Sequence, residues 1–170
     1  MQQTEKAVRK LSDAVDKIYI WIGIVFLAAL TAATFIQVVG RYVFNSSPSW
    51  TDELARYSFV WANMLGAATA LKHGHHAAID LLPNKLHGIA KSVQKTVVDC
   101  LVTFASGLLL VEGWKMTLAI YKTGQLSPAM RIPVWIIYLS IAVGGLGMII
   151  HCATFLIDDM NSFAEGGEKA

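Results

Sequence analysis

The feature that most constrains this chain is the run of residues 18–39, which contains no charged side chain. A helix needs about 20 mainly apolar residues to cross roughly 30 Å of hydrocarbon. Residues 54–71, 96–114 and 133–157 form three further runs of similar character. Only 15% of all residues are charged, compared with about 25% in an ordinary soluble domain. The sequence therefore predicts an all-α integral membrane protein with four transmembrane helices.

The placement of lysine and arginine predicts the orientation of these spans. We expect residues 1–17 and the tail, residues 158–170, to lie in the cytoplasm on either side of a membrane domain of residues 18–157. This orientation puts nine basic residues on the cytoplasmic side: Lys6, Arg9, Lys10, Lys17, Lys72, Lys85, Lys91, Lys95 and Lys169. The five on the opposite side are Arg41, Arg56, Lys115, Lys122 and Arg131.

The connection between the second and third spans contains an amphipathic segment, residues 82–94 (LPNKLHGIAKSVQ). Leu82, Leu86, Ile89 and Val93 recur at helical spacing, with lysines on the opposite face. This pattern is typical of a short interfacial helix lying in the headgroup plane. It fits an early start of the third span equally well.

A histidine-rich stretch, residues 73–76 (HGHH), is followed by Asp80. His76 and Asp80 are four residues apart and would share a helix face, and both side-chain types bind zinc. Structural zinc normally has four ligands at recognised spacings, which this stretch lacks. His151 has no histidine partner at its depth, which disfavours bis-histidine haem. We therefore expect this chain to bind no metal and no other cofactor.

The sequence contains no recognised catalytic motif. Asp52 and Glu53 are adjacent and would point about 100° apart on a helix, so they cannot act as a pair. Asp52 suits the N-terminus of a helix, for which Thr51 is the expected N-cap. The net charge of +2 gives no ground for nucleic-acid binding. Because charges fall near span ends rather than at mid-membrane, we expect a non-catalytic subunit or scaffold, not an enzyme, a channel or an autonomous transporter.

Six short motifs lie along the membrane domain. They are residues 37–45 (QVVGRYVFN), 50–57 (WTDELARY), 59–61 (FVW), 76–80 (HAAID), 123–129 (TGQLSPA) and 132–135 (IPVW). Their order and spacing resemble the small, Q-type membrane subunit of TRAP (tripartite ATP-independent periplasmic) transporters. The resemblance covers roughly residues 18–157.

The resemblance implies a three-part uptake system in the bacterial inner membrane. A periplasmic substrate-binding protein captures an organic acid, and a large, elevator-type membrane subunit carries the substrate and binds sodium. The small subunit forms a tight complex with the large one and widens its fixed scaffold. Sialic acid and C4-dicarboxylates are the leading substrate classes, with a slight preference for sialic acid. The alternative is a stand-alone four-helix membrane protein such as a cytochrome or a metal-binding factor.

The resemblance also supplies candidates for contact with a partner or with membrane phospholipids. The seven candidates are Arg41, Trp50, Glu53, Arg56, Trp61, His76 and Asp80. Arg41 and Arg56 flank the segment between the first two spans, where they would face the binding protein or lipid headgroups, or only anchor the spans. Small residues allow close helix association in lipid. The small residues expected to contact the large subunit are Ala28, Ala29, Ala32, Ala33, Gly144, Gly145 and Gly147.

Overall fold

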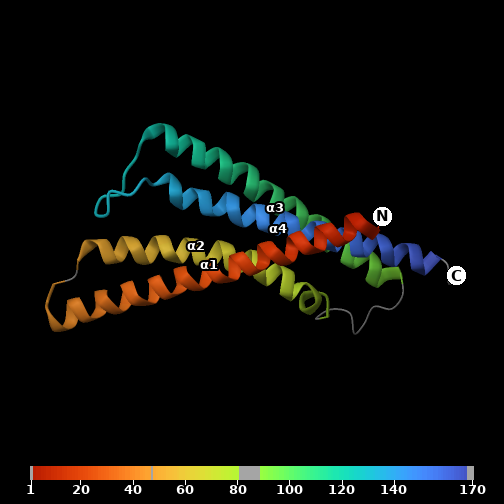
Figure 1. The fold of residues 1–170 in the computed structure, drawn as a ribbon, viewed down its shortest axis with the longest axis horizontal. Helices are drawn as coiled ribbons and strands as arrows, with labels where there is room; N and C mark the ends of the chain where they lie inside the picture. Colours follow the sequence, from red (N-terminus) through yellow and green to blue (C-terminus); the bar gives the residue numbers. More distant parts are fainter. Residues whose placement is uncertain (1, 47, 81–88, 168–170) are drawn as a thin grey trace.

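The computed structural model consists of four long helices joined by short connections (Figure 1). It describes the backbone of residues 2–46, 48–80 and 89–167, and the side chains of residues 6–46, 48–73 and 96–157. The helices are α1 (Gln2–Val43), α2 (Ser49–Asp80), α3 (Ile89–Thr123) and α4 (Trp135–Gly167). The predicted all-α fold and the number of helices are confirmed.

The helices form two antiparallel hairpins, α1 with α2 and α3 with α4. Both α1 and α2 also pack against α4. Figure 1 shows the two chain termini at the same end of the molecule, where the hairpins meet, and the hairpins diverging towards the loops at the other end. The described part of the chain is therefore packed tightly at one end and splayed at the other.

Three of the helices are long and apolar enough to cross a membrane: α1 over Lys6–Val43, α3 over Thr96–Thr123 and α4 over Trp135–Ile157. Among the described residues, α2 has the length but not the composition. It lies against both α1 and α4. The crossing of the membrane by α2, and the cytoplasmic location of both termini, stay predictions.

The helix boundaries differ from the expected ones in several places. α1 includes most of the N-terminal segment, residues 1–17, without a break. Residues 89–94 are the first part of α3, as in the second of the two alternatives above, whereas residues 82–88 lie outside the described residues. α4 begins at Trp135 rather than at Pro133. Pro133 instead lies at the entrance of α4, where its carbonyl accepts the N–H of Ile136 at 3.2 Å.

The prediction that Thr51 is an N-cap is wrong, because α2 begins two residues earlier, at Ser49. The Thr51 side chain is buried, and its hydroxyl donates to the carbonyl of Pro48 at 2.7 Å. Asp52 lies in the first turn of α2, as expected. A carboxylate there interacts favourably with the helix dipole.

Glycines of α4 make the closest contacts between helices. A Cβ on Gly145 would lie 2.7 Å from the backbone nitrogen of Leu110 in α3, and one on Gly147 would lie 2.2 Å from the ring of Tyr19 in α1. The Tyr19 hydroxyl also donates to the carbonyl of Val143 at 2.6 Å. These glycines were expected to contact a partner subunit. The structure shows that they pack within the chain.

The small residues of α1 behave differently from these glycines. Ala33 is buried, with 1% of its surface exposed, whereas Ala28 and Ala32 are exposed and Ala29 is half-buried. Ala28 and Ala32 therefore remain available for contact with another molecule.

We expect replacement of Gly145 by valine to lower the stability of the bundle by about 1–3 kcal/mol, because the new side chain would overlap the backbone of α3. Thermal unfolding in detergent, followed by tryptophan fluorescence, measures the change. The matched control is Gly107→Val in α3, where an added Cβ meets nothing within 4 Å. Equal shifts in the two variants would show that the contact between α3 and α4 does not depend on Gly145.

Candidate functional site

A buried carboxylate, Glu53 in the second turn of α2, holds the loop between α3 and α4. Its side chain accepts hydrogen bonds from the hydroxyl of Ser127 at 2.8 Å and from the backbone N–H groups of Ala129 and Met130 at 3.0 and 2.9 Å. Only 7% of Glu53 is exposed. We call this arrangement (Glu53, Ser127, Ala129, Met130) the Glu53 clamp. It links α2 to a loop more than 70 residues away in the sequence.

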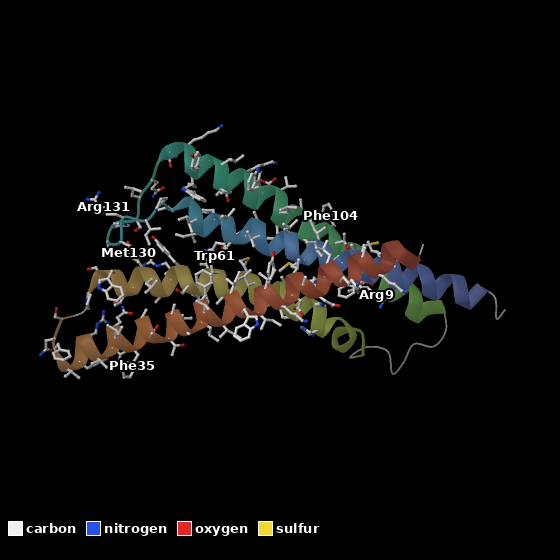
Figure 2. The ribbon with its side chains drawn as sticks, in the orientation of Figure 1. Arg9, Phe35, Trp61, Phe104, Met130 and Arg131 are labelled. Atoms are coloured by element: carbon white, nitrogen blue, oxygen red, sulfur yellow. The ribbon has the colours of Figure 1, made fainter. Side chains whose placement is uncertain are left out.

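The loop has a defined backbone of its own. The N–H of Ser127 donates to the carbonyl of Ile132 at 2.9 Å, and Leu126 and Pro133 form an isolated antiparallel bridge. Arg131 is exposed and has a φ of 58°, a left-handed conformation in which few non-glycine residues are found. Figure 2 shows Met130 and Arg131 at the end of the molecule where the hairpins diverge. The Glu53 clamp therefore presents a structured loop at this end.

The charge of Glu53 depends on these hydrogen bonds. Burial raises the pKa of the carboxyl, but the hydrogen bonds from Ala129, Met130 and Ser127 outweigh it, so the pKa lies below the ordinary glutamate value. Glu53 precedes the second predicted span, residues 54–71. Since three donors converge on it, the carboxylate is suited to hold the loop rather than to accept a proton in a reaction.

A second polar cluster joins α1, α2 and α4. Lys72 of α2 lies 2.8 Å from Asp13 and 3.5 Å from Asp16 of α1, and the Nε2 of His73 lies 3.0 Å from the same Asp16 oxygen. His151 of α4 is fully buried, and its Nδ1 is 2.8 Å from the hydroxyl oxygen of Ser12. We call this set the Asp16 cluster; its members are Ser12, Asp13, Asp16, Lys72, His73 and His151.

The Asp16 cluster contains two buried ionisable groups, Asp16 and His151. Asp16 is 6% exposed, and the described part of the chain offers no hydrogen-bond partner to its Oδ1 or to the Nε2 of His151. Buried polar groups in proteins are normally paired, and here the partners come from neighbouring helices. The cluster therefore acts between helices of this chain.

The described residues contain no group of three histidine, cysteine or carboxylate side chains that could hold a metal ion. His73, from the histidine-rich stretch, binds Asp16 instead. The backbone of residues 74–80 belongs to α2, but the side chains of His76 and Asp80 lie outside the described residues. The expectation that these two residues contact a partner stays a prediction.

The other candidate residues lie at the splayed end or on the face between α1 and α2. Arg41 is exposed in the last turn of α1, and Trp50 is 41% exposed at the start of α2. Arg56 is exposed and forms an ion pair with Asp52 one turn before it. Trp61 is half-buried, and its ring stacks on Phe26 of α1 with centroids 5.3 Å apart. The structure thus brings Trp50, Glu53 and Arg56 together in the first turns of α2.

We expect Glu53→Gln to release the loop between α3 and α4. Both carboxylate oxygens accept hydrogen bonds from this loop, whereas the amide has an NH₂ group in place of one oxygen, and that group cannot accept a hydrogen bond. Hydrogen exchange at the amides of Ala129 and Met130 should become roughly tenfold faster or more. Glu112→Gln is the matched control, since the Glu112 carboxylate is exposed and pairs only locally with Lys115.

The same clamp predicts a pH dependence of stability. A depressed folded-state pKa means that the contribution of Glu53 is complete above the ordinary glutamate pKa and is lost as the pH falls through the lower folded value. In the wild type, the amides of Ala129 and Met130 should therefore lose their protection against hydrogen exchange as the pH falls below the ordinary glutamate pKa. The Glu53→Gln variant should show no such pH-dependent loss. An unchanged exchange rate in Glu53→Gln at neutral pH would contradict the clamp.

Comparison with known proteins extends the resemblance seen in the motifs. Residues 30–161, well over half of the chain, match the family described as "Tripartite ATP-independent periplasmic transporters, DctQ component". A Haemophilus influenzae protein described as a TRAP transporter small permease is 28% identical over 162 residues, which are 95% of this chain and 99% of the relative.

Two longer relatives match over part of their length only. The sialic acid TRAP transporter permease SiaT of Haemophilus influenzae is 32% identical over 88 residues, 52% of this chain and 14% of that protein. The isethionate TRAP transporter permease DctMQ of Oleidesulfovibrio alaskensis is 28% identical over 127 residues, 72% of this chain and 19% of that protein. The family is a transporter component, which confirms the prediction of a non-catalytic, multi-pass membrane protein. This chain therefore belongs to the DctQ family, the small permease component of the tripartite ATP-independent periplasmic transporters.

Proposed function

We propose that this chain is the fixed support for the large, substrate-carrying subunit of a sodium-coupled TRAP transporter for an organic acid. The observation that carries the proposal is the pair of longer permeases, in which a segment similar to this chain makes up 14% and 19% of a single polypeptide. In those proteins the small segment and a much larger part are covalently joined. A separate small chain of the same family is expected to bind the larger part as a partner.

The distribution of polar groups favours a scaffold role for this chain. The charged residues of the Asp16 cluster bind one another across α1 and α2, and His151 binds Ser12. They link helices instead of lining a passage. Substrate and sodium sites in secondary transporters are formed near mid-membrane by interrupted helices. All four helices described here run without interruption, so we place both sites in the large subunit.

The names of relatives indicate the range of substrates. They specify sialic acid, isethionate, ectoine and, in two relatives that match 63% of this chain, C4-dicarboxylates. We propose an organic acid, with sialic acid slightly preferred over a C4-dicarboxylate. No observation favours the alternative of a stand-alone cytochrome or metal-binding factor.

The splayed end provides a surface for the periplasmic binding protein. Arg41 at the end of α1, Arg56 in α2 and Arg131 in the loop that the Glu53 clamp holds are all exposed. Anionic lipid headgroups would also be attracted to these arginines. Charges at the rim of an interface mainly change the rate at which two proteins associate. We propose that these arginines face an acidic surface of the docked binding protein.

Co-expression with a large TRAP permease subunit from the same organism tests the main proposal. We expect a tagged form of this chain to retain the large subunit through detergent purification. Reconstituted into liposomes with the binding protein, the complex should take up substrate only with an inward sodium gradient. The large subunit alone should give no uptake. Uptake by the large subunit alone, or purification of this chain without any partner, would contradict the proposal.

Reversal of one exposed charge tests the docking surface. Arg41→Glu should raise the concentration of binding protein that gives half-maximal uptake by about 2–10-fold, because a rim charge changes mainly the association rate. The maximal rate and the yield of the complex should not change. Lys17→Glu, an exposed charge on the same helix towards the opposite end, is the control. Identical results for the two variants would exclude docking at Arg41.

A further inference from the structure

The outer surface of the α1/α2 hairpin contains an open groove. It has a volume of about 530 Å³ and is lined by residues of both helices, among them Gly23 and Leu27 of α1 and Phe59, Asn63 and Gly66 of α2. A shallower hollow along α1 shares Ile24 and Leu27 with it. The α1–α2 groove therefore belongs to a longer recess on this face of the hairpin.

Small residues form the floor of the α1–α2 groove. Ala62, Gly66 and Ala70 follow one another at four-residue spacing along α2 and all line the groove. A Cβ on Gly66 would meet nothing within 4 Å, in contrast to the crowded glycines of α4. Four-residue spacing of small residues lets a second helix approach closely in lipid. Gly66 is thus a place where another helix can fit, but where none of the four described helices packs.

Polar atoms in the groove favour a protein occupant over lipid chains. Asn63 lies near the middle of α2, and its side chain is exposed; its amide donates to the carbonyl of Phe59 at 2.9 Å. Asparagine side chains commonly hydrogen-bond across helices in membranes. An acyl chain offers neither donor nor acceptor.

The composition of α2 points in the same direction. Among the described residues, α2 is the long helix that is not apolar enough to count as a membrane span, although α1 and α4 pack against it. On α3, by contrast, exposed side chains such as Leu101, Phe104 and Leu108 suit contact with lipid chains. If α2 lies within the bilayer, its face that carries polar side chains must be covered by protein.

We propose that one transmembrane helix of the large permease subunit occupies the α1–α2 groove. The inference rests on the proposed function and specifies where the partner binds. The partner is identified by the two longer permeases, in which a segment similar to this chain is joined to a much larger part. Gly66 lets the partner helix approach the backbone of α2, and the exposed amide of Asn63 offers it a hydrogen bond.

Site-specific photo-crosslinking in the intact complex tests this placement. p-Benzoyl-phenylalanine is introduced at Phe59, which lines the groove and is 54% exposed, or at Phe104 of α3, which is 67% exposed. Irradiation of membranes containing this chain and its large subunit should link position 59, but not position 104, to the large subunit. Crosslinks from position 59 only to lipid or to a second copy of this chain would overturn the proposal, as would crosslinks from position 104 alone.

Filling the groove provides a second test. Gly66→Leu should reduce the amount of large subunit that co-purifies by about tenfold or more, since the leucine occupies the space of the partner helix. Gly107→Leu is the matched control, because a Cβ there also meets nothing within 4 Å. Unfolding temperatures of both purified variants show whether the chain itself is intact. A Gly66→Leu chain that retains the large subunit at the wild-type level would overturn the proposal.

The two proposals fail in different ways. If the wild-type chain does not co-purify with the large subunit, the proposed function is wrong. If the wild-type complex forms and transports substrate, but neither the crosslinker at position 59 nor Gly66→Leu has the expected effect, only the location in the groove is wrong.

Discussion

Close packing along one stretch of α4 holds the bundle together. Residues 144–147 (GGLG) meet all three other helices: Gly144 meets Met64 of α2, Gly145 meets Leu110 of α3, and Gly147 meets Tyr19 of α1. A Cβ on these glycines would lie 3.0, 2.7 and 2.2 Å from the nearest atoms. Because the hydrophobic effect contributes little between helices in lipid, such contacts and hydrogen bonds provide the association. α4 is therefore the axis around which the chain is built.

Polar contacts fix the two ends of the bundle where this packing stops. The Asp16 cluster ties α1 to α2 and to α4 near the termini. At the splayed end, the Glu53 clamp ties α2 to the loop between α3 and α4. The two hairpins are thus joined at both ends, although their helices diverge. An arrangement of this kind resists relative sliding of its helices, which suits the fixed part of a transporter better than its moving part.

Sequence patterns predicted the helices but not the contacts between them. A charge-free run such as residues 18–39 can hardly form anything but a membrane helix. The partners of Gly145 or Glu53 depend on which helices are neighbours, and neither hydropathy nor motif spacing contains that information. Ser127 stands in a recognised motif, yet its bond to Glu53 spans 74 positions. The predicted start of α2 is wrong for a local reason. Threonine is a common N-cap residue, but the hydroxyl of Thr51 donates to the carbonyl of Pro48, just before the helix, instead of accepting a backbone N–H.

The composition of α2 connects this packing to the function. A helix surrounded by protein can contain residues that a lipid-facing helix cannot, because neighbouring helices satisfy its polar groups. α1 and α4 cover part of α2, but Asn63 and Gly66 remain on its exposed side. The exposed side of α3 is rich in large apolar side chains, as lipid contact requires. The departure of α2 from that composition therefore supports the proposal that a protein partner, and not lipid, covers this face.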